Sequence, residues 1–215
     1  MDEINNTYRK VGYALLVVGI LDIGLMIWAI SNEQSYSSSL NIFAVIAGIF
    51  LIKGSVKTAR IVRWISAFSL LAFGALLVIY PLMMPIDLLI VQFKLNTSNI
   101  LLSLLFSSAL LGFIFWVYKQ LSNQESLASF ETAGYKTGKP KSALYVVIGI
   151  FILGLTMVIP AFTGESATKA LMLAKEQYGP DYKYHLTNLN FSGDHVNAII
   201  IAYNNETVKN VKVGW

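Results

Sequence analysis

The sequence contains no cysteine and few charged residues, and both shortages restrict what the chain can be. Without thiols it has no disulfide bond, no thiolate nucleophile and no zinc–sulfur site. Charged residues make up 13% of its 215 positions, about half the share that is usual in soluble domains. Hydrophobic residues make up 55%, and the mean hydropathy is +0.60. The composition therefore predicts a protein whose solvent is largely lipid.

Five apolar stretches approach the roughly 20 residues that a helix needs to cross the hydrocarbon core of a bilayer. The third is expected to end at Pro81 and the fifth at Pro160, because proline interrupts helical hydrogen bonding. The second is the weakest, since Lys53 lies inside it and its ammonium group must reach the headgroups. The first is too long for the core of a cleaved signal peptide and is interpreted as an anchor. The predicted spans are residues 11–30, 40–56, 61–80, 100–118 and 143–160.

Basic residues alternate between the successive segments that flank these spans. The segments carry two, none, four, one and four of them in order: Arg9 and Lys10; none in 31–39; Lys53, Lys57, Arg60 and Arg63; Lys94; Lys119, Lys136, Lys139 and Lys141. Short cytoplasmic loops hold the excess of Lys and Arg in membrane proteins. The pattern predicts a cytoplasmic N-terminal tail, residues 1–10, and a C-terminal domain, residues 163–215, on the periplasmic side of a cell inner membrane.

Two of the connecting loops differ in character. The loop between spans three and four contains a short apolar piece, Ile86–Phe93, which cannot cross a bilayer and is expected to be interfacial or re-entrant. The loop at 119–142 is rich in Ser, Gly, Thr and Lys, which predicts a flexible cytoplasmic linker. Phe130 and Tyr135 are expected to anchor that linker to the membrane interface.

The C-terminal domain changes from a helical to a β-type pattern. Apolar residues recur at helical spacing at Ala167, Ala170, Leu171, Ala174 and Tyr178. Gly179 and Pro180 are expected to end that helix. Three strands follow at residues 182–191, with a bulge near Asn188, and at 195–203 and 207–215.

The predicted fold class is thus an all-α polytopic membrane bundle of about five transmembrane helices, residues 11–162, with a small C-terminal α+β domain. That domain is a helix followed by a three-stranded antiparallel meander. It has about 50 residues, a size at which a hydrophobic core is marginal. We therefore expect it to rest on the membrane, on the loop between spans three and four, on a second copy or on a partner.

Asp22 is the most unusual residue of the predicted membrane region. A carboxylate in the middle of a span costs about 2.5–3.5 kcal/mol on insertion scales unless it is paired or protonated. It is either an ion or proton site or the acceptor of a hydrogen bond that fixes helix packing. Lys53 is one candidate partner, although it must reach up the helix by about a turn. Gly19 and Gly24 on either side allow close helix approach.

Two further sets of residues have both a structural and a functional interpretation. Small residues give span four a face suited to helix packing, or to a hydroxyl-lined pathway: Ser103, Ser107, Ser108 and Gly112. Basic residues and a tryptophan at helical spacing form either the ordinary topology determinant or a site for anionic lipid headgroups: Lys53, Lys57, Arg60, Arg63 and Trp64.

The sequence predicts no catalytic, metal or cofactor residues, and we expect the chain not to be an enzyme. No paired acids, histidine cluster or nucleophile–base pair falls at one membrane depth. The basic residues form no single stripe, so nucleic acid is not an expected partner. One hypothesis is an accessory, assembly, regulatory or immunity protein whose outer domain binds another envelope protein, or which self-associates in the bilayer. The alternative is a small oligomeric transporter or channel that uses Asp22.

Overall fold

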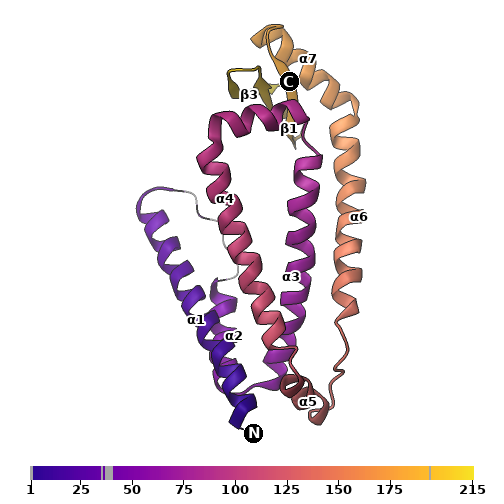
Figure 1. Ribbon diagram of the computed structural model, residues 1–215. Helices are drawn as coiled ribbons and strands as arrows, with labels where there is room; N and C mark the ends of the chain where they lie inside the picture. The colour runs from indigo at the N-terminus through magenta and orange to yellow at the C-terminus, as the bar shows by residue number, and fades with distance from the viewer. Residues whose placement is uncertain (1, 35, 37–40, 194) are drawn as a thin grey trace. The chain divides into compact units, whose positions relative to one another are not determined.

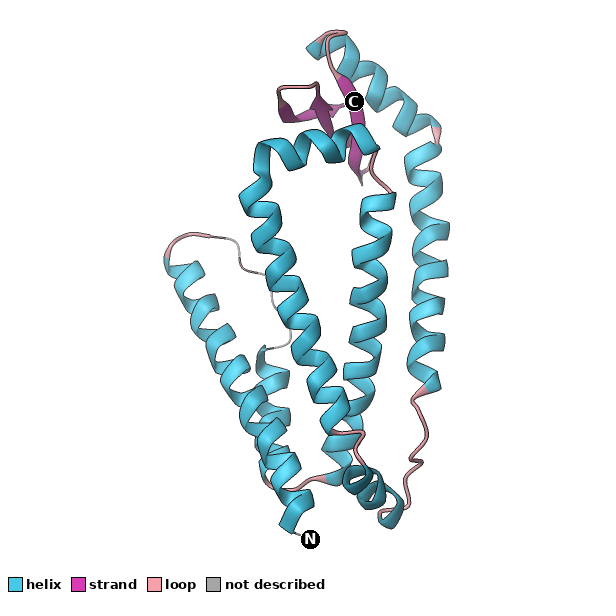
Figure 2. Ribbon diagram, viewed as in Figure 1, coloured by secondary structure: helices cyan, strands magenta, loops and turns pink. Residues whose placement is uncertain are grey.

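The computed structural model describes residues 2–34, 36, 41–193 and 195–215, and within them seven helices and three strands (Figures 1 and 2). In chain order the elements are α1 (Asp2–Ser31), α2 (Asn41–Ile52), α3 (Val56–Leu82), α4 (Ile86–Gln120), α5 (Gln124–Thr132), α6 (Lys141–Thr163), α7 (Glu165–Tyr178), β1 (Lys183–Ser192), β2 (His195–Tyr203) and β3 (Val208–Gly214). The chain forms two units, residues 1–72 with 110–145 and residues 73–109 with 146–215, which are described in turn.

Four helices in the described part of the chain are long and apolar enough to cross a bilayer: Asn6–Ser31, Val56–Leu82, Ile86–Gln120 and Lys141–Thr163. They contain four of the five predicted spans. The remaining span, 40–56, contains only α2, which has 12 residues and is about 18 Å long. That length is less than the roughly 30 Å of a hydrocarbon core, so the helix lengths do not confirm a count of five.

Pro81 and Pro160 do not end their helices as the sequence predicts. Both lie inside, and α3 and α6 continue to Leu82 and Thr163. A proline near the C-terminal end of a helix removes its own N–H donor and crowds the carbonyl four residues earlier, but few residues follow that need to stay helical. The two helices therefore extend slightly past the predicted boundaries.

In the first unit, α1 and α2 pack closely as a helical hairpin through two glycines. A Cβ atom on Gly12 would lie 2.8 Å from the carbonyl oxygen of Gly48, and a Cβ on Gly48 would lie 2.7 Å from that of Gly12. Only residues without a side chain allow this approach. The contact places the N-terminal part of α1 beside the C-terminal part of α2, so the helices are antiparallel.

The prediction of a flexible linker at 119–142 is wrong, because this segment is folded into the first unit. It contains α5, whose Asn123 cap accepts a hydrogen bond from the backbone N–H of Ser126 at 2.8 Å. Phe130 is fully buried with Tyr8, Val11 and other residues of the same core. Phe130 contributes a large aromatic side chain to this core from inside a polar segment, which composition alone did not reveal.

In the second unit, α4 is divided by a kink at Asn96, whose backbone is not helical (φ −129°, ψ 33°). Its first segment, residues 86–95, runs across the direction of the rest of the helix (Figure 1). This segment contains the apolar piece that the sequence predicts to be interfacial or re-entrant.

The C-terminal domain is α7 followed by an antiparallel sheet in the order β1-β2-β3, as the sequence predicts. The register of β1 shifts between Leu186 and Asn188, which confirms the predicted bulge. Gly179 has a φ of 90° directly after α7, a conformation that favours glycine. The chain can therefore turn sharply from the helix into the sheet.

Both faces of the sheet are covered within the second unit, at least in part. On one face the small residues Ala167, Ala170 and Ala174 of α7 bring the helix close to Ile200 and Val211. The opposite face is covered at one end by α4, where a further buried cluster contains Leu88, Ile201 and Tyr203, with Val208 packed against it. The first segment of α4 is thus one of the supports that the small domain was expected to need.

Candidate functional site

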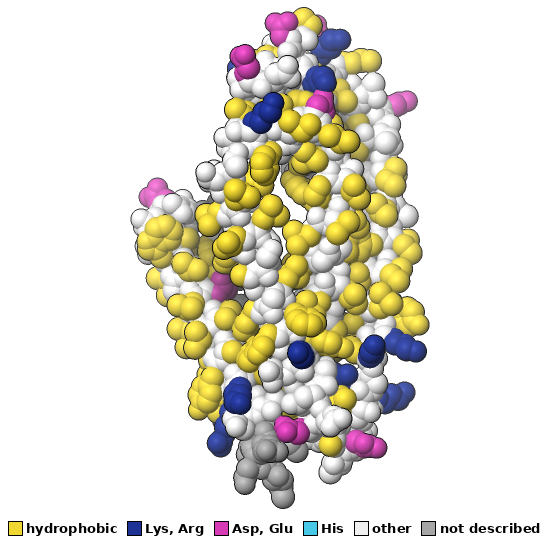
Figure 3. Space-filling model, in the orientation of Figure 1, with side chains coloured by type: hydrophobic (Ala, Val, Ile, Leu, Met, Phe, Trp, Pro, Cys, Tyr) yellow, Lys and Arg dark blue, Asp and Glu magenta, His cyan; other side chains and the backbone are white. Residues whose placement is uncertain are grey.

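A crevice of about 440 Å³ lies between the first segment of α4 and the end of the C-terminal sheet. Three parts of the second unit form its walls: residues 87–94 of α4, the turn between α7 and β1, and the turn between β2 and β3. Figure 3 shows basic and acidic side chains close together at this end of the unit. The lining residues are Asp87, Ile90, Val91, Lys94, Pro180, Asp181, Tyr182, Lys183, Tyr203, Asn204 and Asn205.

Asp87 joins α4 to the sheet at the floor of this crevice. Its carboxylate accepts a hydrogen bond from the hydroxyl of Tyr203 at 3.1 Å and forms an ion pair with Lys183. It also accepts from the backbone N–H of Leu88 at 3.1 Å, as acidic residues in the first turn of a helix often do. The side chains of Asp87 and Lys183 are 45% and 69% exposed, so water screens their ion pair. The pair orients the two side chains but adds little to the free energy of unfolding.

Tyr203 is the buried partner in this arrangement. Only 4% of the residue is exposed, and burial together with the hydrogen bond to Asp87 raises the pKa of its phenol to about 12. Burial is the larger cause of the raised pKa, because it disfavours the charged phenolate. The carboxylate of Asp87 raises the pKa further. The hydroxyl therefore stays protonated, and a donor, at physiological pH.

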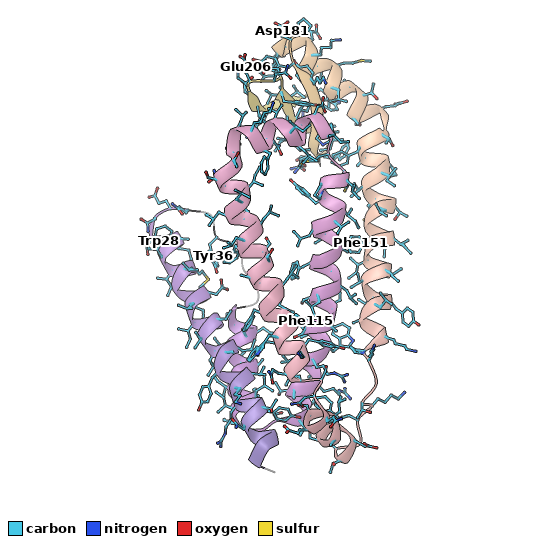
Figure 4. The ribbon with its side chains drawn as sticks, in the orientation of Figure 1. Trp28, Tyr36, Phe115, Phe151, Asp181 and Glu206 are labelled. Atoms are coloured by element: carbon cyan, nitrogen blue, oxygen red, sulfur yellow. The ribbon has the colours of Figure 1, made fainter. Side chains whose placement is uncertain are left out.

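Two charged residues of the crevice have no ionic partner in the part of the chain that the structure describes. The one salt bridge found there joins Asp87 to Lys183, which leaves Lys94 and Asp181 unneutralised. Figure 4 shows Asp181 beyond the end of α7, at the same end of the unit as Glu206 on the β2–β3 turn. Among the described residues, the crevice thus presents one unpaired cation and one unpaired anion to a ligand.

The outer edge of β3 is a second candidate site, because β2 is its one neighbour in the described sheet. Val196 and Trp215 exchange both backbone hydrogen bonds, at 2.8 and 3.0 Å. Since these bonds alternate along an antiparallel pair, Val211 and Val213 direct their backbone groups toward β2. Asn210 and Lys212 direct theirs away from the sheet.

Asp22 lies in α1 and accepts hydrogen bonds from the hydroxyl of Tyr36, both at its carboxylate and at its carbonyl oxygen (3.0 Å for the latter). The contact between Gly12 and Gly48 sets the register of the hairpin. Asp22 is ten residues further along α1 than Gly12, so it lies level with the start of α2. Lys53, the candidate partner, lies at the other end of α2.

The predicted basic cluster at the start of α3 divides into exposed and buried members. Lys53, Lys57 and Arg60 are exposed, but Arg63 is only 5% exposed. Arg63 donates from Nε to the hydroxyl of Ser122 at 2.9 Å, and from Nη2 to two backbone carbonyls. Those carbonyls are at Thr137, 3.3 Å, and Gly138, 3.2 Å. Arg63 therefore holds the folded linker and is not available to a lipid headgroup.

Two aromatic side chains, Trp64 of α3 and Tyr135 of the linker, also take part in contacts between α3 and residues 119–142. The indole N–H of Trp64 donates to the hydroxyl of Ser142 at 2.9 Å, and its ring stacks on Phe68 at 5.7 Å. The guanidinium of Arg60 lies 4.3 Å from the ring centroid of Tyr135. Tyr135 thus binds a cation of α3, where the sequence predicts a membrane anchor.

Most of the residues predicted for close helix packing lie open among the described residues. A Cβ on Gly24 or Gly112 would meet no atom within 4 Å, although Gly19 is buried. Ser103 and Ser108 are exposed and Ser107 is half-buried. The close approach is instead at Gly12 and Gly48, which the sequence analysis did not single out.

Four long apolar helices whose side chains are largely uncovered by protein, followed by a small α-β-β-β domain, indicate a multi-pass membrane protein. No known protein family, curated protein or solved structure matches the chain. The assignment therefore rests on the chain's own sequence and geometry.

Proposed function

We propose that the chain is a non-enzymatic membrane protein of the accessory, assembly, regulatory or immunity type, whose C-terminal domain binds a protein partner in the periplasm. In this proposal it crosses the inner membrane five times, with its N-terminus in the cytoplasm. The observation that carries the binding role is the open edge of β3 on a sheet whose faces are already partly covered.

The hairpin of α1 and α2 supports the fifth crossing. Because Gly12 contacts Gly48, exposed Arg9 and Lys10 lie at the same end of the hairpin as exposed Lys53. Basic residues on one side of a bilayer are typical of cytoplasmic segments. The chain leaves that end in α1, which is long enough to cross. It returns through α2, which ends at Ile52 beside the start of α1.

The two edge strands, β1 and β3, differ in how readily a further strand can pair with them. A bulge interrupts β1, and such bulges protect edges from further pairing. The register of β3 against β2 is unbroken from Val208 to Gly214. An extended segment of another protein can therefore add to β3 through regular backbone hydrogen bonds.

The charge of this edge defines the partner more closely. Exposed Lys209 and Lys212 lie on β3, and lysines on an edge strand oppose pairing between two copies of the same strand. An acidic extended segment neutralises them, so we propose a partner that contributes such a segment. Like-charge repulsion then excludes basic competitors.

A proline substitution tests the edge without changing the pairing inside the sheet. Asn210→Pro removes an outward backbone N–H, whereas Asn210→Ala keeps it and serves as the matched control. A photo-crosslinking amino acid at Glu206, an exposed residue of the turn before β3, in the full chain in its native membrane, is expected to capture the partner. Capture should be retained in Asn210→Ala and lost in Asn210→Pro. A folded Asn210→Pro protein that captures the partner equally well contradicts the proposal.

The transporter or channel alternative is favoured by one observation, the position of Asp22 inside the helix Asn6–Ser31. The hydrogen bonds from Tyr36 provide a structural explanation for the same residue. The substitution Asp22→Asn keeps an acceptor and removes the charge. Loss of ion or proton flux in proteoliposomes with an unchanged melting temperature supports transport, and unchanged flux excludes a role of this carboxylate.

A further inference from the structure

The first segment of α4, residues 86–95, has two different faces. Leu88 and Val91 are buried, at 0% and 6% exposure, and Leu88 packs against the sheet. The side chains of Ile86, Ile90 and Phe93 recur at helical spacing on the other side and are 76%, 51% and 45% exposed. A short helix that is apolar on its free face suits the boundary between lipid tails and headgroups.

The neighbouring chain supports this placement. The segment follows α3, which is long enough to cross a bilayer, and leads through the kink at Asn96 into the apolar remainder of α4. Its ten residues are about 15 Å long, so the segment cannot cross alone. Leu82 and Met83 just before it are also apolar and exposed, at 79% and 53%.

With residues 86–95 at this boundary, the crevice opens at the depth of the headgroups. Lys94 lines it from the end of the segment next to the kink, one turn after Ile90. Asp181 lines it from the turn between α7 and β1. Neither has an ionic partner among the described residues, so a ligand with one anionic and one cationic group neutralises both.

We propose that this crevice binds the headgroup of a phosphoethanolamine phospholipid from the leaflet in which residues 86–95 lie. Lys94 binds the phosphate, since an ammonium group forms a charge-assisted hydrogen bond with it. Asp181 binds the lipid ammonium, and Tyr182 and Asn205 supply further polar groups. The volume of about 440 Å³ lies within the range of small-molecule sites. The proposal rests on membrane insertion and not on the protein-binding role of β3.

The test uses the full chain in detergent micelles and titration with dioleoylphosphatidylethanolamine, followed by native mass spectrometry. Lys94→Gln is expected to weaken lipid binding about tenfold, the size of a lost charge-assisted contact. Lys94→Arg should retain binding. Lys175→Gln is the matched control, because Lys175 is an exposed lysine of α7 outside the crevice.

A second pair of measurements identifies the headgroup and its source. Asp181→Asn should weaken binding of the ethanolamine lipid but leave dioleoylphosphatidylglycerol, which has no ammonium group, unchanged. Soluble phosphoethanolamine should compete poorly, because it lacks the acyl chains that lie against residues 86–95. Equal affinities of Lys94→Gln and Lys175→Gln overturn the site, and equal competition by soluble phosphoethanolamine overturns its assignment to a lipid.

Discussion

The hydroxyl of Tyr203 donates a hydrogen bond to the carboxylate of Asp87 and so joins the end of β2 to the first turn of α4. The two residues are 116 positions apart in the sequence. Beside them, Leu88 covers one end of the face of the sheet that α7 leaves open. This contact turns an isolated sheet of marginal size into part of a larger folded unit.

The first prediction concerns the apolar half of that contact. Leu88→Ala should lower the free energy of unfolding of the second unit by about 2–5 kcal/mol, because it leaves a cavity where a side chain is fully buried. Leu95→Ala, at a position that is 48% exposed, is the control and should have little effect. Thermal unfolding of the full chain in detergent measures both. Equal melting temperatures for the two variants would contradict the contact.

The second prediction concerns pH. The folded domain favours the neutral phenol of Tyr203, whose pKa is raised to about 12, above the value of about 10 for an unfolded tyrosine. Its contribution to stability is therefore complete below pH 10 and is lost as the pH rises through 12. The difference in melting temperature between the parent chain and Tyr203→Phe should shrink over this interval. A constant difference would show that Tyr203 is not the group responsible.

The third prediction concerns the hairpin of α1 and α2. Gly12→Ala and Gly48→Ala should each destabilise the protein by about 1–3 kcal/mol, since a methyl group overlaps the facing backbone. Gly24→Ala is the matched control, because a Cβ there meets no atom within 4 Å and alanine favours the helix. Chemical or thermal unfolding in detergent distinguishes them. A Gly12→Ala protein as stable as Gly24→Ala is incompatible with the described packing.

The fourth prediction concerns the folded linker. Arg63→Met should release residues 122–138, because Arg63 donates hydrogen bonds to Ser122, Thr137 and Gly138. Trypsin should then cleave after Lys136 much faster than in the parent chain. Lys57→Met, which removes an exposed cation from the same helix, should not increase cleavage. Rapid cleavage of the parent chain itself would mean that the linker is not folded.

Local patterns in the sequence were sufficient to predict much of the C-terminal domain. The recurrence of Ala167, Ala170 and Ala174 follows the period of a helix, and α7 buries those residues. The slip in alternation near Asn188 corresponds to an extra residue in β1. Both features are determined by residues close together in the sequence, so the spacing of apolar side chains is enough to predict them.

Features that depend on distant residues were not predicted. The level of Asp22 follows from the contact of Gly12 with Gly48, and apolar helices carry no polar stripe that would fix their register. The linker is folded because Phe130 and Arg63 pack together, with 5.8 Å between the guanidinium and the ring centroid. The crevice likewise combines residues from α4 with residues near β1, and no spacing in the sequence links them.

The central claim is that the N-terminus and the C-terminal domain lie on opposite sides of the membrane. The absence of cysteine allows a direct test, in which Gln124→Cys in α5 and Lys175→Cys in α7 are labelled separately in intact cells or spheroplasts. A membrane-impermeant maleimide is expected to label the chain with Lys175→Cys at once, and the chain with Gln124→Cys only after the membrane is permeabilised. Labelling of both from the same side, or of the α5 position alone before permeabilisation, would contradict the account.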